Sequence, residues 1–94
     1  DVSHSKLAAN HLGRSFKEFV DIVGPHTAHL HLVDAAGVDG EGLQVGDGEI
    51  DWPLLAEQLD IHTPNAAFIP EIWQGHKNEG EDFWIALDRL EKWF

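Results

Sequence analysis

The fold is decided by the stretch Thr27–Val33, whose sequence is Thr-Ala-His-Leu-His-Leu-Val. Apolar and polar side chains alternate along it, which is the period of a β-strand with one buried face. Leu30 and Leu32 are therefore expected on one face, with His29 and His31 on the other. The sequence predicts a strand that presents two imidazoles side by side.

Helices are predicted before and after this strand. Between Ser15 and Val23 the apolar residues recur at the spacing of one helical face, and Ser15 with Glu18 forms a capping box. Asp51 is a good N-cap for a second helix, which is expected to run to about Leu59. A third, amphipathic helix is predicted to begin at about Asp82.

The remaining segments complete an alternation of strands and helices. Ala66–Trp73 is expected to be a strand, and Asp1–His4 the end of a strand whose beginning is missing. Asp34–Ile50 holds five of the nine glycines and is expected to be a long loop. Such alternation implies parallel strands joined by helices. Three βα units are too few for a closed barrel, so we expect a piece of a barrel, an open layered fold, or part of an oligomer.

Composition excludes several classes of function. The chain has 94 residues, and 17 acidic against six basic residues give a formal net charge of −11. A field of that sign repels nucleic acid and anionic membranes, so neither is expected as a partner. There is no cysteine and therefore no thiol chemistry. No signal layout or membrane span is present, and a cytoplasmic location is expected.

Polar residues able to bind a metal gather where the expected strands end. Asp1 and His4 belong to the first strand end, His31 to the second, and Glu71 to the third. Ligands of parallel α/β folds bind at the carboxyl ends of strands. Singly, each residue has an ordinary structural explanation, but their common placement predicts a divalent-metal or sugar site with imidazole and carboxylate ligands.

The order of these motifs resembles the C-terminal part of the xylose-isomerase-like TIM-barrel superfamily, the sugar and sugar-phosphate isomerases and epimerases. The resemblance rests on Asp1-x-x-His4, on His29-Leu30-His31 followed by Asp34, on Gly48–Trp52, and on the strand that ends in Pro70-Glu71. It implies a partial (β/α)8 barrel of about the last three βα units. It also implies that residues 1–94 form one domain of a longer barrel protein.

The resemblance also implies roles for individual residues. Asp1, His31 and Glu71 would bind one divalent metal (Mn²⁺, Mg²⁺, Co²⁺ or Zn²⁺), and His4 would contact the substrate. Glu71 would also act as an acid/base carboxylate in proton transfer through a metal-bound enediolate-like state. The second carboxylate of the family lies on an earlier strand that is absent here, so the isolated chain is not expected to be a functional epimerase.

Further residues are candidates for contact with a sugar or sugar phosphate. His29 and Asp34 lie within the matching motif, and Glu41 and Gln44 have side chains suited to sugar hydroxyls. A helix start after the last strand is a common phosphate site in TIM barrels. The last two candidates, for a phosphate group, are His76 and Lys77.

Two other functions stay open at this stage. A non-catalytic acidic interaction module would keep the shape of a partial barrel without the chemistry. An endonuclease IV-like metallonuclease is disfavoured by the net charge, since it needs a basic surface facing DNA. Association with a second copy, or with the missing barrel half, is also expected, because three βα units leave strand edges and helix faces uncovered.

Overall fold

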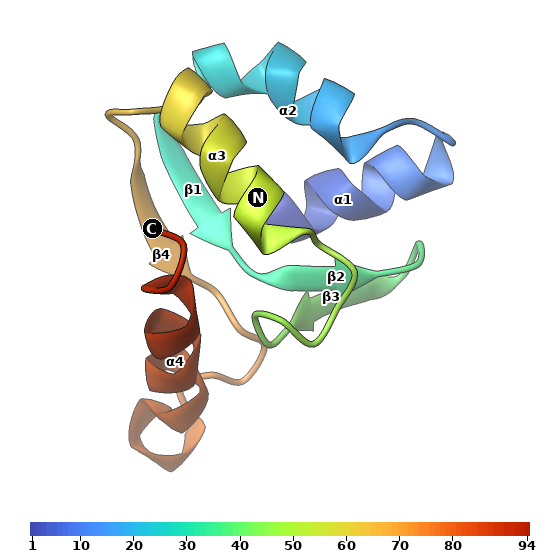
Figure 1. The fold of residues 1–94 in the computed structure, drawn as a ribbon. Helices are drawn as coiled ribbons and strands as arrows, with labels where there is room; N and C mark the ends of the chain where they lie inside the picture. Colours follow the sequence, from blue (N-terminus) through green and yellow to red (C-terminus); the bar gives the residue numbers. More distant parts are fainter.

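The computed structural model describes residues 1–94 and contains four α-helices and two small sheets. β1 (His29–Leu32) pairs in parallel with β4 (Ala67–Pro70), and β2 (Asp34–Ala36) pairs antiparallel with β3 (Gly40–Leu43). Figure 1 shows the two sheets in continuation along β1 and β2. The helices are α1 (Val2–His11), α2 (Phe16–Val23), α3 (Trp52–His62) and α4 (Lys77–Leu90), with a short 3-10 turn at Gly24–His26.

This arrangement shows that the expected partial barrel is wrong. Only two strands are parallel, and they form a separate two-stranded sheet rather than a three-unit βα array. The single parallel connection runs from β1 through α3 to β4, with Leu30 opposite Phe68. The fold is a small α/β structure whose second sheet is an antiparallel hairpin.

The first correction concerns the N-terminal segment, which is helical and not the end of a strand. Asp1 caps α1, and its Oδ1 accepts the backbone N–H of His4 at 2.8 Å. A carboxylate at this position satisfies an N–H that the first helical turn leaves free. The helix then continues through Leu7 and Ala9, both of which are buried.

The second correction concerns the glycine-rich segment, which is a folded hairpin followed by an ordered loop. Asp34 pairs with Leu43 and Ala36 with Gly40 across the two strands. Gly37 takes a φ of +64° at the turn, which a residue with a Cβ adopts at a cost. The hairpin places Glu41 near the N-terminus of α1, in contact with His4.

Several local predictions are confirmed. α2 ends at Val23 as expected, and Ser15 accepts the backbone N–H of Glu18 at its start. Asp51 caps α3 by accepting the backbone N–H of Leu54 at 3.1 Å, although the helix runs one turn beyond Leu59. The strands are shorter than predicted, because β1 and β4 pair over only four residues each.

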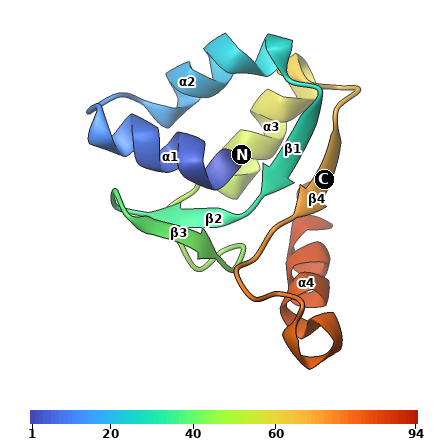
Figure 2. The same cartoon turned by 180° about the vertical axis from the view of Figure 1, so that it is seen from behind.

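One apolar core joins the helices to the sheets. β1 contributes Leu32, α3 contributes Leu55 and Leu59, and α4 contributes Leu90, all of them buried. Figures 1 and 2 show α1, α2 and α3 gathered on one side, whereas α4 extends away beyond β4. None of the helices combines the length and the apolar character that crossing a membrane requires.

Candidate functional site

The pairing of β1 with β4 places His31 beside Glu71. His31 lies opposite Ile69 in the register, and the backbone N–H of Glu71 donates to the carbonyl of Leu32 at 3.2 Å. Because side chains alternate along a strand, the ring of His31 lies on the face opposite the core residue Leu32. Nδ1 of His31 then approaches Oε2 of Glu71 at 2.9 Å.

Asp1 joins this pair from the start of α1. Its Oδ2 lies 3.9 Å from Nδ1 of His31, and one possible ligand atom from each of Asp1, His31 and Glu71 lies within 4.8 Å of the others. The structure thus brings together the three residues expected to bind a metal. The expected reason was incorrect for Asp1, which arrives as a helix cap and not at a strand end.

His4 and Glu41 extend the cluster along its rim. Nδ1 of His4 lies 3.3 Å from Oδ2 of Asp1, and its Nε2 contacts Oε2 of Glu41 at 2.5 Å. Carboxylates and imidazoles therefore alternate from Glu41 through His4, Asp1 and His31 to Glu71. The side chains of His4 and Glu41 are each 62% exposed, so water screens this pair strongly.

Two backbone contacts hold β3 against this cluster. The N–H of Gly42 donates to Oγ of the buried Ser3 at 3.4 Å, which ties β3 to α1. The carbonyl of Gly42 accepts the N–H of Trp73 at 3.0 Å, which ties β3 to the segment after β4. The contacts of Gly42 therefore hold the backbone of the adjacent Glu41 in place, although the side chain of Glu41 is exposed.

The cluster opens into a shallow cavity of about 360 Å³. Its walls come from the start of α1, from β3 and from the segment that follows β4. Three of the ten lining residues are hydrophobic, and the carboxylates and the imidazole of the lining come from all three of these segments. The lining residues are Asp1, Ser3, His4, Val33, Glu41, Gly42, Glu71, Ile72, Trp73 and Gln74.

Asp34 lies elsewhere, in the core, and has no exposed surface. Its Oδ1 accepts the N–H groups of Ala35 and Ile50, and its Oδ2 accepts those of Gly46 and the Trp52 indole, at 2.8 to 3.1 Å. All four bonds organise the glycine-rich loop around one carboxylate. This side chain does not reach the cavity expected to hold a sugar.

Gln44 lies away from its expected position, whereas His29 lies beside His31, as the alternation of the strand predicts. The Gln44 amide donates to the Asp82 carbonyl at 2.9 Å and accepts the Val45 N–H, so it joins the loop to α4. The ring of His29 packs edge-on against that of His31 with centroids 5.4 Å apart, beside the three-residue cluster but outside it. His29 is adjacent to the site, and Gln44 is not part of it.

His76 and Lys77 do not lie at a regular helix N-terminus. Asn78, Glu79 and Gly80 all have positive φ values, between 52° and 80°, so the start of α4 is a left-handed turn. The parallel N–H groups that bind phosphate at a helix start are therefore not arrayed there. His76 lines a second small hollow with Glu71, and Lys77 is exposed.

Several residues of the cavity wall, Trp73 among them, and one polar cluster were not predicted from the sequence. Trp73 lines the cavity. The sequence signal that could have identified it is its position two residues after the candidate ligand Glu71. Between α2 and α3, the Asp21 carboxylate contacts Lys17, Gln58 and His62 at 2.8 to 3.1 Å. The hydrogen bond from Lys17, then that from Gln58, lowers the pKa of Asp21, and His62 adds to the effect.

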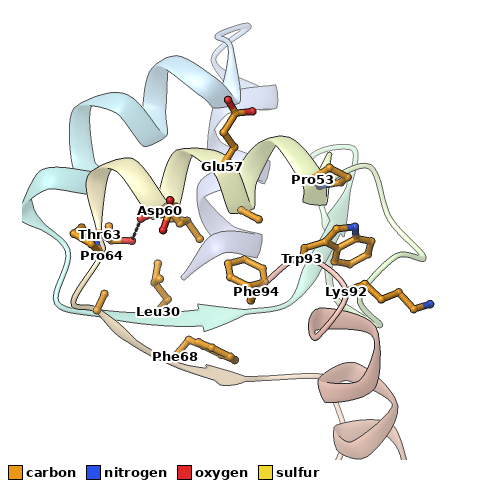
Figure 3. Close-up of a pocket in the computed structure, with 13 residues that line it drawn as sticks. Leu30, Pro53, Glu57, Asp60, Thr63, Pro64, Phe68, Lys92, Trp93 and Phe94 are labelled. Carbon is orange, nitrogen blue, oxygen red and sulfur yellow. Dashed lines mark hydrogen bonds between the residues drawn. The ribbon is translucent and has the colours of Figure 1, made fainter.

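Another hollow lies on the other face of the β1–β4 sheet. It is a groove of about 590 Å³ between α3, the sheet and the C-terminal residues, and both apolar and charged side chains line it. Figure 3 shows Leu30, Phe68 and Phe94 around it. Because Leu30 and His31 are neighbours on one strand and point to opposite faces, this groove is separate from the polar cavity.

No family model matches this chain, and no curated protein or solved structure matches it either. The xylose-isomerase-like resemblance therefore rests on the sequence motifs alone. The geometry of the cavity and that resemblance are the two grounds on which a function can be proposed.

Proposed function

We propose that Asp1, His31 and Glu71 bind one divalent cation and that the adjoining cavity binds a sugar. The observation that carries this proposal is the convergence of three ligand atoms within 4.8 Å from three segments far apart in sequence. The activity we propose is that of a sugar or sugar-phosphate isomerase or epimerase site, as the motif resemblance implies. A cytoplasmic location stays a prediction.

The donor set suits a metal of this kind. Two carboxylates and one imidazole match the ligands of Mn²⁺, Mg²⁺, Co²⁺ and Zn²⁺ in proteins. The three side chains are 22%, 42% and 55% exposed, so the cluster is accessible from water and leaves room for ligand oxygens. A bound divalent cation would also compensate the repulsion between the carboxylates of Asp1 and Glu71.

The chemistry of the cavity follows from its carboxylates. A divalent cation supplies charge stabilisation to neighbouring sugar oxygens when it is bound. Glu71 directly follows β4 and would take a proton from the carbon beside the carbonyl of a sugar whose ring has opened, and a second group would have to return that proton. Glu41, which contacts His4, would accept hydrogen bonds from hydroxyl groups, and the imidazole of His4 could donate to them. Asp1 orients the cluster, since its second oxygen caps α1.

One observation favours the non-catalytic alternative. His31 and Glu71 already contact each other at 2.9 Å, so the pair is satisfied as an exposed hydrogen-bonded contact without a cation. In that case the acidic surface would serve association, and the cluster would be structural. Direct measurement of metal binding separates the two functions.

The test is calorimetric titration of the purified chain with Mn²⁺ and Co²⁺. We expect one site of micromolar affinity, weakened by about tenfold or more in His31→Ala and in Glu71→Gln. His11→Ala is the matched control, because His11 is an exposed imidazole at the far end of α1. Equal affinity in all four proteins, or no binding by any, would reject the metal site.

A further inference from the structure

Trp73 is the most exposed of the large apolar side chains, with 74% of its surface accessible, and it lines the polar cavity. A single exposed apolar residue needs no explanation by itself. This one lines the same cavity as the carboxylates of Glu71 and Glu41. Its indole is the only large apolar ring among the residues that line this cavity.

The backbone at Trp73 is held tightly against β3. Its N–H donates to the Gly42 carbonyl at 3.0 Å. Gly42 has a φ of +70°, and a Cβ on it would lie only 2.9 Å from the Cβ of Trp73. Only glycine at position 42 permits this approach, so the backbone and Cβ of Trp73 are held against β3.

The residue after Trp73 adopts a costly conformation. Gln74 has a φ of 59°, a left-handed value that a residue with a Cβ adopts at a cost of roughly 1–3 kcal/mol. Hydrogen bonds from Gly75 N–H to the Ile72 carbonyl and from Lys77 N–H to the Gln74 carbonyl hold the turn. The fold therefore maintains strain directly after an exposed tryptophan that lines the cavity.

We propose that Trp73 is a stacking platform for the apolar face of a cyclic monosaccharide, whose hydroxyl groups face the carboxylates of the same cavity. The inference rests on the proposed sugar site and names its substrate class. A sugar ring has hydroxyl groups at its edge and C–H groups on its faces. The negative face of an indole attracts the slightly positive C–H groups, and the carboxylates accept hydrogen bonds from the hydroxyl groups.

An indole beside carboxylates would favour a ligand that has a flat ring face as well as hydroxyl groups. An open polyol such as glycerol has hydroxyl groups for the carboxylates but no ring face to lay on an indole. Small ligand sites commonly combine apolar or aromatic contacts with a few polar groups that fix orientation. We therefore expect the cavity to prefer a pyranose or furanose over an open polyol.

The experiment labels the four tryptophans with 5-fluorotryptophan and follows them by ¹⁹F NMR. Single Trp→Phe substitutions assign the resonances, and D-xylose and D-fructose are titrated with Mg²⁺ and again with EDTA. Glycerol is the control ligand. We expect the Trp73 resonance to shift saturably with at least one of the two ring sugars, while that of Trp84 stays in place. Trp84 is a suitable control because it is 64% exposed on α4 and does not line the cavity.

Substitutions give the second arm of the test. Trp73→Ala is expected to weaken sugar binding about tenfold or more, Trp73→Phe to retain most of it, and Trp84→Ala to change it less than about twofold. Trp73→Leu, of related bulk but without a ring, should behave like Trp73→Ala. Circular dichroism of each variant checks that the fold is kept, and the Trp73 resonance of the unsubstituted chain tests the proposal independently of them.

The outcomes separate this inference from the metal site. A Trp73 shift that persists in EDTA, in a chain that binds no Mn²⁺, would support stacking and reject the metal. Metal binding without a Trp73 shift by either sugar would support the metal and reject stacking. Sugar binding that leaves Trp73 unshifted, or that Trp73→Ala does not weaken, would also overturn the proposal.

Discussion

Asp34 shows how one residue can be conspicuous in sequence and yet serve the fold. As part of the motif that resembles the sugar isomerases, it was expected to contact a sugar. Its carboxylate instead accepts four N–H groups in a fully buried position. An ionised side chain at such a site is tolerated because its oxygens are satisfied by hydrogen bonds. Nothing in the sequence distinguishes a carboxylate that binds a ligand from one that binds its own loop.

Asp34→Asn is expected to destabilise the chain by about 1–3 kcal/mol, because one oxygen is replaced by an NH₂ group that faces N–H donors. Urea denaturation followed by circular dichroism measures the change. Asp39→Asn is the matched control, since Asp39 is an exposed carboxylate at the hairpin turn and should change stability by less than about 0.5 kcal/mol. Equal stability of the two variants would contradict a structural role for Asp34.

At the scale of elements, the predictions succeeded where a periodic pattern was supported by a cap. α2 combines a regular apolar face with Ser15, and α3 begins at Asp51 and Pro53. α1 has no such apolar face, and Asp1 is equally suited to a strand end or a helix cap, so the sequence did not decide between them. The hairpin was missed because Gly40 and Gly42 carry no side chains to alternate, and only the pairing between strands defines it.

The sequence did predict that Asp1, His31 and Glu71 lie close together. The alternation of β1 sets the face on which His31 lies, and the parallel crossover brings Glu71 beside it. Those two positions follow from strand geometry alone. The contacts of Glu41 with His4 and of Gly42 with Trp73 depend on how the hairpin packs, which no local pattern encodes.

The contact between α2 and α3 is expected to depend on pH. The pKa of Asp21 is lowered in the folded chain, chiefly by the hydrogen bond from Lys17 and then by that from Gln58. The ionised carboxylate therefore adds stability above its unfolded pKa, and this contribution is lost as the pH falls through the lowered folded value. Asp21→Asn should cost stability at pH 7 and progressively less as the solution is acidified below pH ~4.

Thermal unfolding of both proteins across that acidic range measures the difference. Asp60→Asn is the control, because Asp60 is an exposed carboxylate on α3. The difference in melting temperature between this variant and the unsubstituted chain should not change with pH. If the melting temperatures of the unsubstituted chain and Asp21→Asn differed by the same amount at every pH, the stabilising role of the ionised Asp21 would be contradicted.

At the scale of the whole molecule, charge and exposed apolar surface act in opposite directions. The net charge of −11 makes two copies repel each other, whereas the β1–β4 sheet has no further strand on either side. Phe68 and Ile69 on β4 are 41% and 44% exposed. Parallel strands are ordinarily covered on both faces.

We expect copies of the chain to associate, and the association to strengthen with salt as the repulsion is screened. Sedimentation equilibrium at micromolar concentrations, in low and high NaCl, measures both effects. Ile69→Lys should weaken association, and Ile22→Lys, at a still more exposed position on α2, should not. A folded species of monomeric mass at every salt concentration would refute the prediction.

The β1–α3–β4 crossover also has a consequence for the order in which the chain folds. The pairs Leu30–Phe68 and His31–Ile69 join segments separated by the hairpin, the glycine-rich loop and all of α3. Contacts of such long sequence separation require the closure of a large loop and tend to slow folding. Local structure such as α2 and the β2–β3 hairpin can form without that closure. The cavity walls would then meet only when β4 docks, so the polar cluster would be among the last parts of the molecule to assemble.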